Sequence, residues 1–335
     1  MTPSPVSPPS VPVEDPLEDS VSVIIPCYNA ARYLPRAVAS ALEQTGIGPL
    51  QVVLVDDAST DGTADVIADL AARHDAVEGH ANARNMGPAG TRNNALSRAS
   101  GTWIAVLDAD DAYAPGRLAR LIEVARREAL DAIADLPVYY DLAADCPAPQ
   151  QLPADGSLSR MAFADFLVPD PASGLDPGLL KPVYHRRLLE RGILRYPETA
   201  RHGEDCLLYI ALTRAGAAFG FLREARYIFS TRVGAVSGAF SPGSVTDVDY
   251  LLLARQAEEL RASLAEEGIA DEAILQRLDA RRAHVLQLNR RYGWTLLRKA
   301  ELRRLRAWLR QSPQNRRHLL DILVAKLKGH RGLPD

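Results

Sequence analysis

The sequence has few cysteines and no long apolar run. Its three cysteines, Cys27, Cys146 and Cys206, are far apart, which argues against a disulfide framework or a zinc site and favours a reducing compartment. No stretch approaches the roughly 18 apolar residues of a membrane-spanning helix. The N-terminus also has no basic segment followed by an apolar one. We therefore expect a cytoplasmic protein without a membrane span or a secretory signal.

Charge is nearly balanced overall but unevenly distributed. The 335 residues carry a net charge of −3, yet residues 281–331 hold 15 Lys or Arg and only two acids. The rest of the chain has 24 bases and 40 acids. The hydrophobic fraction of 47% is sufficient for a packed core in one large domain or two. We therefore expect an acidic globular body followed by a strongly basic tail.

Between residues 20 and 130 the chain alternates short β-type runs with helical periodicity. The expected strands are 21–26, 51–55 and 102–107, and the expected helices are 34–44, 63–73, 92–98 and one that starts at Pro115. This alternation with short connections predicts an α/β fold with a mostly parallel central sheet. Residues 1–19, which precede it, are rich in proline and are expected to form a disordered leader.

The second half of the chain has a weaker pattern. Residues 136–182 are rich in Pro and Asp and show little periodicity, apart from a short expected helix at 158–167. Helices are predicted at 183–191 and 204–215, and an edge strand is predicted at 225–231. The remainder is predicted to be helical, over 247–264, 271–288 and 290–328, with an interruption near Pro313.

Polar loops follow each of the three expected strands. Because ligands in parallel sheets bind at the carboxyl ends of the strands, the loops after residues 26, 55 and 107 are expected to meet at one crevice. Asp108 and Asp110 stand at positions i and i+2 of the last loop, where two carboxylates can face one Mg²⁺ or Mn²⁺. Taken alone, such acids more often serve as turn or helix-cap residues.

Several short motifs, in order, point to a family. They are Val21-Ser-Val-Ile-Ile-Pro-Cys-Tyr-Asn29, Val55-Asp-Asp-Ala-Ser-Thr-Asp-Gly-Thr63, Asn85-Met-Gly87 with Arg92-Asn93, Leu107-Asp-Ala-Asp-Asp111, and Gly203-Glu-Asp205. With them the chain resembles the family-two inverting nucleotide-sugar glycosyltransferases of the GT-A fold. The resemblance implies a glycosyltransferase domain over 20–240, with a nucleotide-binding half at 20–120 and an acceptor half at 121–240. An α-helical C-terminal region would follow over 241–335.

The resemblance implies that the first two loops contact the base of a nucleotide-sugar donor. Tyr28 would stack on the base, to which a flat ring is suited, although a packing role remains the alternative. Pro26 would lie beside the base, and Asn29 would shape the loop. Asp57 would accept a hydrogen bond from a base N–H such as the imide of uracil. This implies a uridine or thymidine nucleotide, and a UDP-linked sugar is the first choice.

The resemblance implies that other residues bind the rest of the donor. Asn85 and Gly87 would form a tight turn, because glycine permits a positive φ and close approach. Arg92 would reach the base or the diphosphate with its forked donors; the alternative is an exposed helical cation. Arg232 resembles the family's late basic residue near the diphosphate.

The resemblance also implies a catalytic metal and a catalytic base. Asp110 would bind Mn²⁺ or Mg²⁺ directly, while Asp108 would contact the ribose or a water on the metal. The cation would offset the charge of the leaving diphosphate. Asp205 would take a proton from an acceptor hydroxyl, and Glu204 would orient that acceptor. The alternative is that both acids only complement a helix N-terminus.

The implied acceptor is a glycan or a lipid-linked sugar in surface or exopolysaccharide synthesis. The tail repeats Leu, Trp and Tyr among Arg at helical spacing, which fits packing on the domain, peripheral contact with an anionic membrane through 281–331, or oligomerisation. Nucleic acid is not an expected partner, because no nucleic-acid motif accompanies the charge. The oligomeric state is not defined by the sequence.

Two other functions are compatible with a related sheet. A sugar-nucleotide nucleotidyltransferase would need a Gly-rich, basic loop after the first strand, where this chain has Pro26-Cys-Tyr-Asn29. A catalytically idle nucleotide-sugar binding module would not need the acids at positions 110 and 205. Both alternatives are therefore less favoured than sugar transfer.

Overall fold

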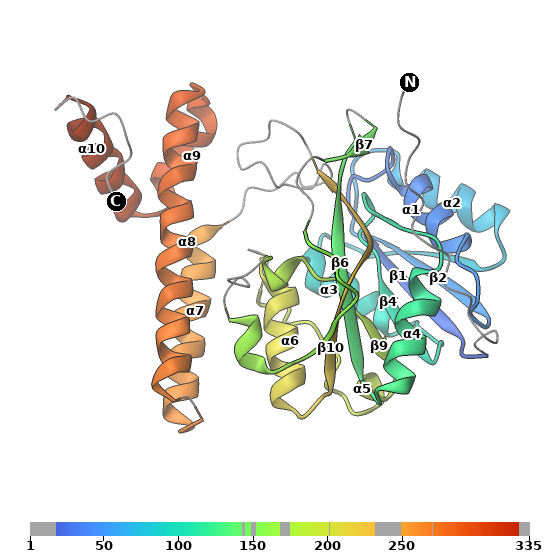
Figure 1. Ribbon diagram of the computed structural model, residues 1–335. Helices are drawn as coiled ribbons and strands as arrows, with labels where there is room; N and C mark the ends of the chain where they lie inside the picture. The colour runs from blue at the N-terminus through green and yellow to red at the C-terminus, as the bar shows by residue number, and fades with distance from the viewer. Residues whose placement is uncertain are drawn as a thin grey trace, which may run out of the picture.

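The computed structural model describes residues 18–142, 145–148, 152–167, 175–200, 202–231, 249–269 and 271–327. Within these residues a ten-stranded sheet has helices on both faces, and the C-terminal helices lie beside it (Figure 1). The strand order is β3-β2-β1-β4-β9-β6-β10-β5, with β7 next to β6 and β8 next to β10. The strands are β1 Val21–Cys27, β2 Leu50–Asp56, β3 Val77–Ala81, β4 Trp103–Val106, β5 Ala112–Tyr113, β6 Ala132–Asp141, β7 Cys146–Pro147, β8 Leu158–Met161, β9 Val183–His185 and β10 Phe219–Thr231.

The strands that precede the three motif-bearing loops are parallel neighbours. β1 lies between β2 and β4, with Val21 opposite both Leu50 and Trp103. β3 extends this parallel group, and β6 and β10 form a second parallel pair. β9 runs antiparallel between the two groups. The expected α/β fold with a mostly parallel central sheet is confirmed.

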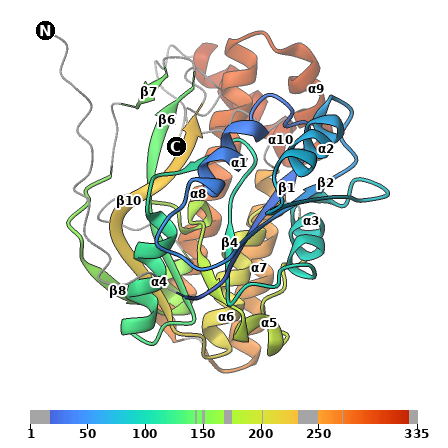
Figure 2. The same cartoon turned by 90° about the vertical axis from the view of Figure 1, so that its right-hand side faces the viewer.

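Helices cover both faces of the sheet because its strands are apolar on both sides. Val23 and Ile25 of β1 face a core shared with α1, α2 and α4, while Ile24 faces a core shared with α3, α5 and α6. Figure 2 shows these helices on the two sides of the sheet. Their bounds are α1 Leu34–Leu42, α2 Thr63–Arg73, α3 Gly87–Leu96, α4 Arg117–Arg127, α5 Arg187–Glu190 and α6 Glu204–Arg214.

The C-terminal helices form a third core and pack on the side of α6. Helices α7 Tyr250–Glu266, α8 Glu272–Arg298, α9 Leu302–Gln311 and α10 Pro313–Leu327 bury Tyr292, Leu305 and Trp308 among their own side chains. Leu264 and Leu278 join the core beneath α6 instead. At Gly203, directly before α6, an added Cβ would lie 2.9 Å from Leu253 of α7. The C-terminal helices are therefore in contact with the domain that contains the sheet.

Three elements of the second half differ from the predictions. Residues 158–167 form β8 and the 3₁₀ turn η1 Phe163–Phe166, because β8 pairs with β10. Residues 183–191 form β9 and the short α5, because β9 fills the gap between β4 and β6. The predicted edge strand 225–231 is part of β10, which lies between β6 and β5 and is not an edge.

The long strand β6 was not predicted, although it is central to the sheet. It contains Pro137, which removes a backbone donor and weakens any strand pattern. In the structure Pro137 lies opposite Tyr227, where the register of β10 shifts between Ala225 and Tyr227. Proline is tolerated in a strand where the hydrogen bonding to the neighbouring strand is irregular, as it is here between β6 and β10. This partner strand comes some 90 residues later, so its irregularity could not be read locally.

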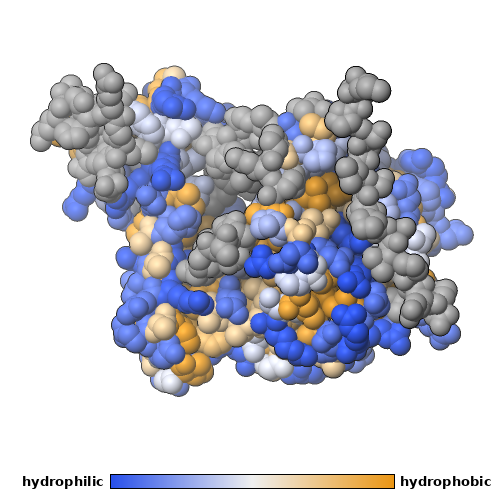
Figure 3. All heavy atoms as spheres, viewed as in Figure 1, coloured by the Kyte–Doolittle hydropathy of each residue, from blue (hydrophilic) through white to orange (hydrophobic). Residues whose placement is uncertain are grey.

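Hydrophobic and hydrophilic residues are interspersed on the face of the molecule that Figure 3 shows, where the hydrophobic residues form separate patches. Among the described residues, no helix has both the length and the apolar character needed to cross a membrane.

Candidate active site

The loops after β1, β2 and β4 lie at one edge of the sheet because the three strands are parallel neighbours, and hydrogen bonds join the first two loops. The amide of Asp57 donates to the carbonyl of Cys27 at 2.8 Å, and the amide of Leu107 donates to the carbonyl of Ile24 at 3.1 Å. Asn29, at a φ of 50°, accepts from the amide of Thr60 at 2.8 Å. The three polar loops share one edge of the sheet as predicted, while the crevice between them stays a prediction. Asn29 shapes the first loop by holding the second.

Asp57 is buried and holds the turn that starts α3. Its carboxylate accepts from the amides of Met86 at 2.7 Å and Gly87 at 2.9 Å, and from Nδ2 of Asn82 at 2.8 Å. Gly87 has a φ of 76°, which glycine adopts at little cost. Asn85 donates from Nδ2 to the carbonyl of Asp57 at 3.4 Å. The expected tight turn is present, and Asp57 has a structural role there; its contact with a base stays a prediction.

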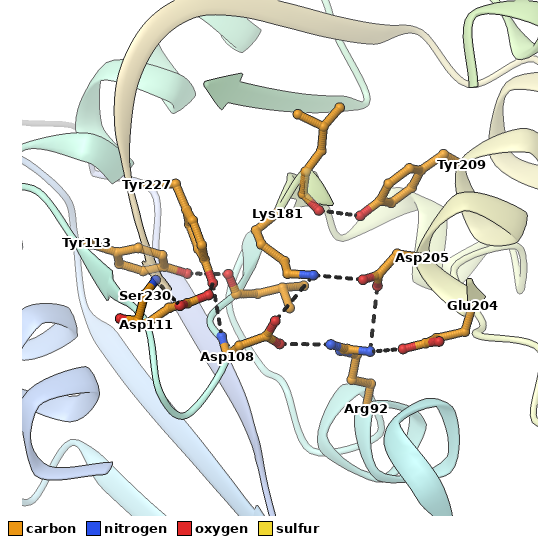
Figure 4. A network of polar contacts seen from close by, with 12 residues as sticks. Arg92, Asp108, Asp111, Tyr113, Lys181, Glu204, Asp205, Tyr209, Tyr227 and Ser230 are labelled. Atoms are coloured by element: carbon orange, nitrogen blue, oxygen red, sulfur yellow. Dashed lines mark hydrogen bonds and ion pairs between the residues drawn. The ribbon is translucent and has the colours of Figure 1, made fainter. Parts of the chain in front are cut away.

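The centre of the site is a network of two cations and three carboxylates, all buried except Asp108, which is 24% exposed (Figure 4). Arg92 donates from Nη2 to Asp108 at 2.8 Å and from Nη1 to Glu204 at 2.7 Å. Lys181 donates from Nζ to Oδ2 of Asp205 at 2.7 Å and lies 3.2 Å from Oδ2 of Asp108. The network thus connects Asp108, in the loop after β4, to Glu204, in the first turn of α6 and 96 residues later in the chain.

The charges of this network stabilise one another. Burial disfavours the ionised form of Asp108, but Lys181 and Arg92 outweigh that effect and lower its pKa to about 2. Burial likewise disfavours the ammonium of Lys181, but Asp108 and Asp205 raise its pKa above the ordinary value. The carboxylate of Asp108 and the ammonium of Lys181 are therefore both charged at neutral pH.

Asp111 belongs to the same loop but faces the sheet. It accepts from the hydroxyl of Tyr227 at 2.7 Å and from the amide of Ser230 at 2.8 Å, which fixes the loop to β10. Burial raises the pKa of Asp111 well above its usual range, and the neighbouring Asp110 and Asp108 raise it further. Asp110 itself is only 7% exposed.

The predicted metal ligands, Asp108 and Asp110, both lie in the loop after β4. Among the described residues, no three His, Cys, Asp or Glu side chains form a group that could hold an ion by themselves. A Mg²⁺ or Mn²⁺ bound through one or two carboxylates takes its other ligands from phosphate and water, and the loop after β4 supplies two carboxylates. Both oxygens of Asp108 already face cations; Asp110 as the direct ligand stays a prediction.

The structure places the remaining predicted residues as follows. Pro26 lies in β1 opposite Val55, and Tyr28 is half-buried directly after β1. Arg92 is 4% exposed and contacts carboxylates, so the alternative of an exposed helical cation is wrong; its contact with a diphosphate stays a prediction. Arg232 lies outside the described residues.

Sequence reasoning missed Lys181, which lies at the centre of the network. It is a single lysine in an irregular stretch between the turn η2 Pro177–Leu179 and β9. Its one local signal is the following proline, which favours an extended backbone at position 181. No pattern of spacing connects it to Asp108 or Asp205, because only the tertiary fold brings the three together.

Comparison with known proteins agrees with this geometry. Residues 22–172 match the family described as Glycosyl transferase family 2. The chain is 32% identical over 261 residues to "Succinoglycan biosynthesis protein ExoO" of Rhizobium meliloti, which covers 75% of this chain and 71% of that protein. This chain belongs to glycosyl transferase family 2.

Other members and solved structures are similar over most of the chain. "Succinoglycan biosynthesis protein ExoU" of Rhizobium meliloti is 34% identical to this glycosyltransferase over 65% of this chain and 64% of its own length. The crystal structure of S. aureus TarS 1–349 in complex with UDP-GlcNAc matches with a TM-score of 0.60 at 20% identity, covering 83% of this chain and 79% of that one. The mannosyltransferase PcManGT from Pyrobaculum calidifontis, in complex with GDP-Man and Mn²⁺, matches with a TM-score of 0.51 at 20% identity, covering 97% and 90%. Both structures support the GT-A fold.

Proposed function

We propose that this family-two glycosyltransferase is a metal-dependent, inverting enzyme. It would transfer a sugar from a nucleotide-sugar, first of all a UDP-linked one, to a glycan or lipid-linked acceptor. Its setting would be surface or exopolysaccharide synthesis, as the names of its succinoglycan relatives suggest, and we expect it to act in the cytoplasm. The observation that carries the proposal is the network that joins the acidic loop after β4 to the acids at the start of α6.

The donor would lie across the carboxyl ends of β1, β2 and β4. Tyr28 and Pro26 would contact the base, and the loop held by Asn29 and Asp57 would give that contact its shape. Asp110 and Asp108 would hold the divalent cation, which neutralises charge on the leaving diphosphate when bound. Arg92 is held near this loop by Asp108 and would add its guanidinium charge to the same region.

The acceptor would be activated from the start of α6. Asp205 would accept the proton of the attacking hydroxyl, and Glu204, which is paired with Arg92, would orient the acceptor. A single displacement inverts the configuration at the anomeric carbon, so an α-linked donor gives a β-glycoside. This role of Asp205 is supported by its proximity to the loop after β4, because Lys181 contacts both Asp205 and Asp108.

Hydrolysis of a panel of UDP-sugars in the presence of Mn²⁺ tests the donor half of the proposal. We expect Asp110→Ala to lose the Mn²⁺-stimulated turnover and Asp69→Ala, at an exposed carboxylate of α2, to keep it. Asp205→Asn should bind UDP with unchanged affinity in calorimetry while its turnover falls by about 10²-fold or more. A fully active Asp110→Ala variant would contradict metal catalysis, and binding without turnover in the unmodified protein would indicate an idle binding module.

The basic region within 281–331 would provide peripheral contact with anionic lipid. On α10, Leu320 follows the exposed Arg316 and Arg317 by four and three residues, and Val324 follows Leu320 by four. The two apolar side chains are 61% and 47% exposed. Exposed arginine beside exposed aliphatic side chains suits an anionic interface.

Leu320→Glu with Val324→Glu should lower co-sedimentation with anionic liposomes and leave hydrolysis of soluble UDP-sugars unchanged. Point variants are preferable to ending the chain at residue 280, because that cut would divide α8. Equal co-sedimentation of variant and parent would leave packing on the domain as the role of the region.

A further inference from the structure

Lys181 is unusual among the charged side chains of the site because nothing in the family motifs accounts for it. It is 5% exposed, and a buried lysine is costly unless its ammonium is paired. Here the pairing is double, with Asp205 at 2.7 Å and Asp108 at 3.2 Å. Lys181 is therefore placed between the loop assigned to the donor and the residue assigned as the base.

The backbone around Lys181 is fixed by buried donors from three elements. The hydroxyl of Tyr209, on α6, donates to the carbonyl of Leu180 at 2.6 Å. Nη2 of Arg117, on α4, donates to the carbonyl of Lys181 at 2.6 Å. The amide of Val106, at the end of β4, donates to the carbonyl of Pro182 at 3.4 Å. The backbone is thus fixed on both sides of the Cα atom that carries the Lys181 side chain.

Asp205 depends on Lys181 for its orientation. Within the part of the chain that the structure describes, Nζ of Lys181 is the one hydrogen-bond donor to the carboxylate of Asp205. Oδ1 of Asp205 is buried without a hydrogen-bond partner and lies 3.6 Å from Nη1 of Arg92. Glu204 differs, because it has a direct hydrogen bond from Arg92. One donor therefore sets which way the carboxylate of Asp205 turns.

We propose that Lys181 is the positioning residue of the catalytic base: its ammonium fixes the carboxylate of Asp205 relative to Asp108, and it acts on sugar transfer through Asp205. This inference rests on the proposed function. Direct contact of Lys181 with the donor diphosphate is the competing role, and it would act independently of Asp205. The two roles differ in one respect: if Lys181 contacts the donor directly, its replacement lowers kcat even when Asp205 has already been replaced.

A double-mutant cycle between positions 181 and 205 separates them. The probe is the UDP-sugar that the unmodified protein hydrolyses fastest with Mn²⁺, and kcat, KM and the affinity for UDP are measured for each variant. We expect Lys181→Met to lower kcat by about 10- to 100-fold, since a positioned base contributes about 10²–10⁴-fold, with KM and UDP affinity within about threefold. Lys181→Arg keeps the charge and should recover kcat to within about tenfold of the parent.

The decisive comparison is in the Asp205→Asn background. There Lys181→Met should change kcat by less than about threefold, because residues that act as a unit are non-additive. The same loss in both backgrounds, or a raised KM in Lys181→Met, would overturn the proposal in favour of direct donor contact or a purely structural role. Arg127→Met, at an exposed cation of α4, should match the parent in both backgrounds.

Two further outcomes keep the test interpretable. If Lys181→Met gives little folded protein, Lys181→Gln takes its place in the cycle, because the amide keeps one donor without the charge. If the unmodified protein hydrolyses no UDP-sugar, or Asp205→Asn is as active as the parent, the proposed function itself fails before the cycle is read. If only the positioning role fails, Asp205→Asn is still inactive, and the effects of the two substitutions on kcat are additive.

Discussion

Replacing Arg117 by methionine should destabilise the protein in a way that depends on pH. Arg117 and Asp135 are both fully buried, and the guanidinium donates to the carboxylate at 2.7 and 3.1 Å. The same guanidinium lies over the rings of Tyr113 and Tyr227, at 4.6 and 5.0 Å from their centroids. Methionine fills similar space but leaves the carboxylate of Asp135 and the carbonyl of Lys181 without these donors.

The expected loss in the free energy of unfolding is about 3–5 kcal/mol near neutral pH, the usual cost of removing one partner of a buried ion pair. A matched surface change, Arg127→Met on the same helix, removes an arginine that is 56% exposed and should cost less than about 1 kcal/mol. The contrast between these two arginines of α4 isolates the effect of burial from that of helix propensity and charge.

The pH dependence follows from the pKa of Asp135. Burial raises this pKa above its ordinary value even though Arg117 lowers it, so loss of Arg117 raises it further. Between about pH 4, where the unfolded carboxyl titrates, and the raised folded pKa, the folded state holds a proton that the unfolded state has lost. Unfolding therefore becomes easier as pH rises, by up to about 1.4 kcal/mol per pH unit.

Urea unfolding of the parent, Arg117→Met and Arg127→Met at a series of pH values measures both quantities. We expect the difference between parent and Arg117→Met to grow from pH 5 to pH 8, and the difference for Arg127→Met to stay small throughout. Parallel stability curves for parent and Arg117→Met would show that Asp135 is not the group left uncompensated, and would refute this reasoning.

Three further predictions concern other parts of the chain. Thiol titration of the folded protein should detect Cys146 rapidly and the other two only on unfolding, because burial raises the pKa of Cys206 to about 11 and that of Cys27 further. Gly293→Ala should lower the melting temperature, since its Cβ would lie 2.4 Å from the ring of Trp308 and overpacking costs about 1–3 kcal/mol. Asp57→Ala should cost about 1–3 kcal/mol in urea unfolding by leaving the buried amides of Met86 and Gly87 without an acceptor.

The first half of the fold was predictable because its signals are local. Alternating apolar strands and amphipathic helices defined β1, α1, β2, α2, β4 and α4 closely. The second half follows long-range pairing instead: β9 is placed by β4 and β6, and β8 by β10. The structure of such short segments depends on the strands with which they pair, so their own sequence gives little indication of that structure.

The site was predictable to the extent that its residues belong to ordered motifs. The motifs identified Asp108, Asp110, Glu204 and Asp205, and the structure brings the loop after β4 and the start of α6 together. The partners of Arg92 were not predicted, because an arginine on a helix gives no sign of which carboxylates it will meet. Lys181 lacked even a motif, and only its burial between two carboxylates reveals it.

The close contact between Leu253 and Gly203 affects how this enzyme can be recombined with its relatives. Gly203 has a φ of 72° and no room for a side chain toward α7, and the next two residues are Glu204 and Asp205. A tail exchanged at the boundary near residue 240 that the sequence predicts would bring a foreign helix against the start of α6. Chimaeras joined in the connection after α7, beyond Glu266, would keep the native side chains there and exchange only the distal helices.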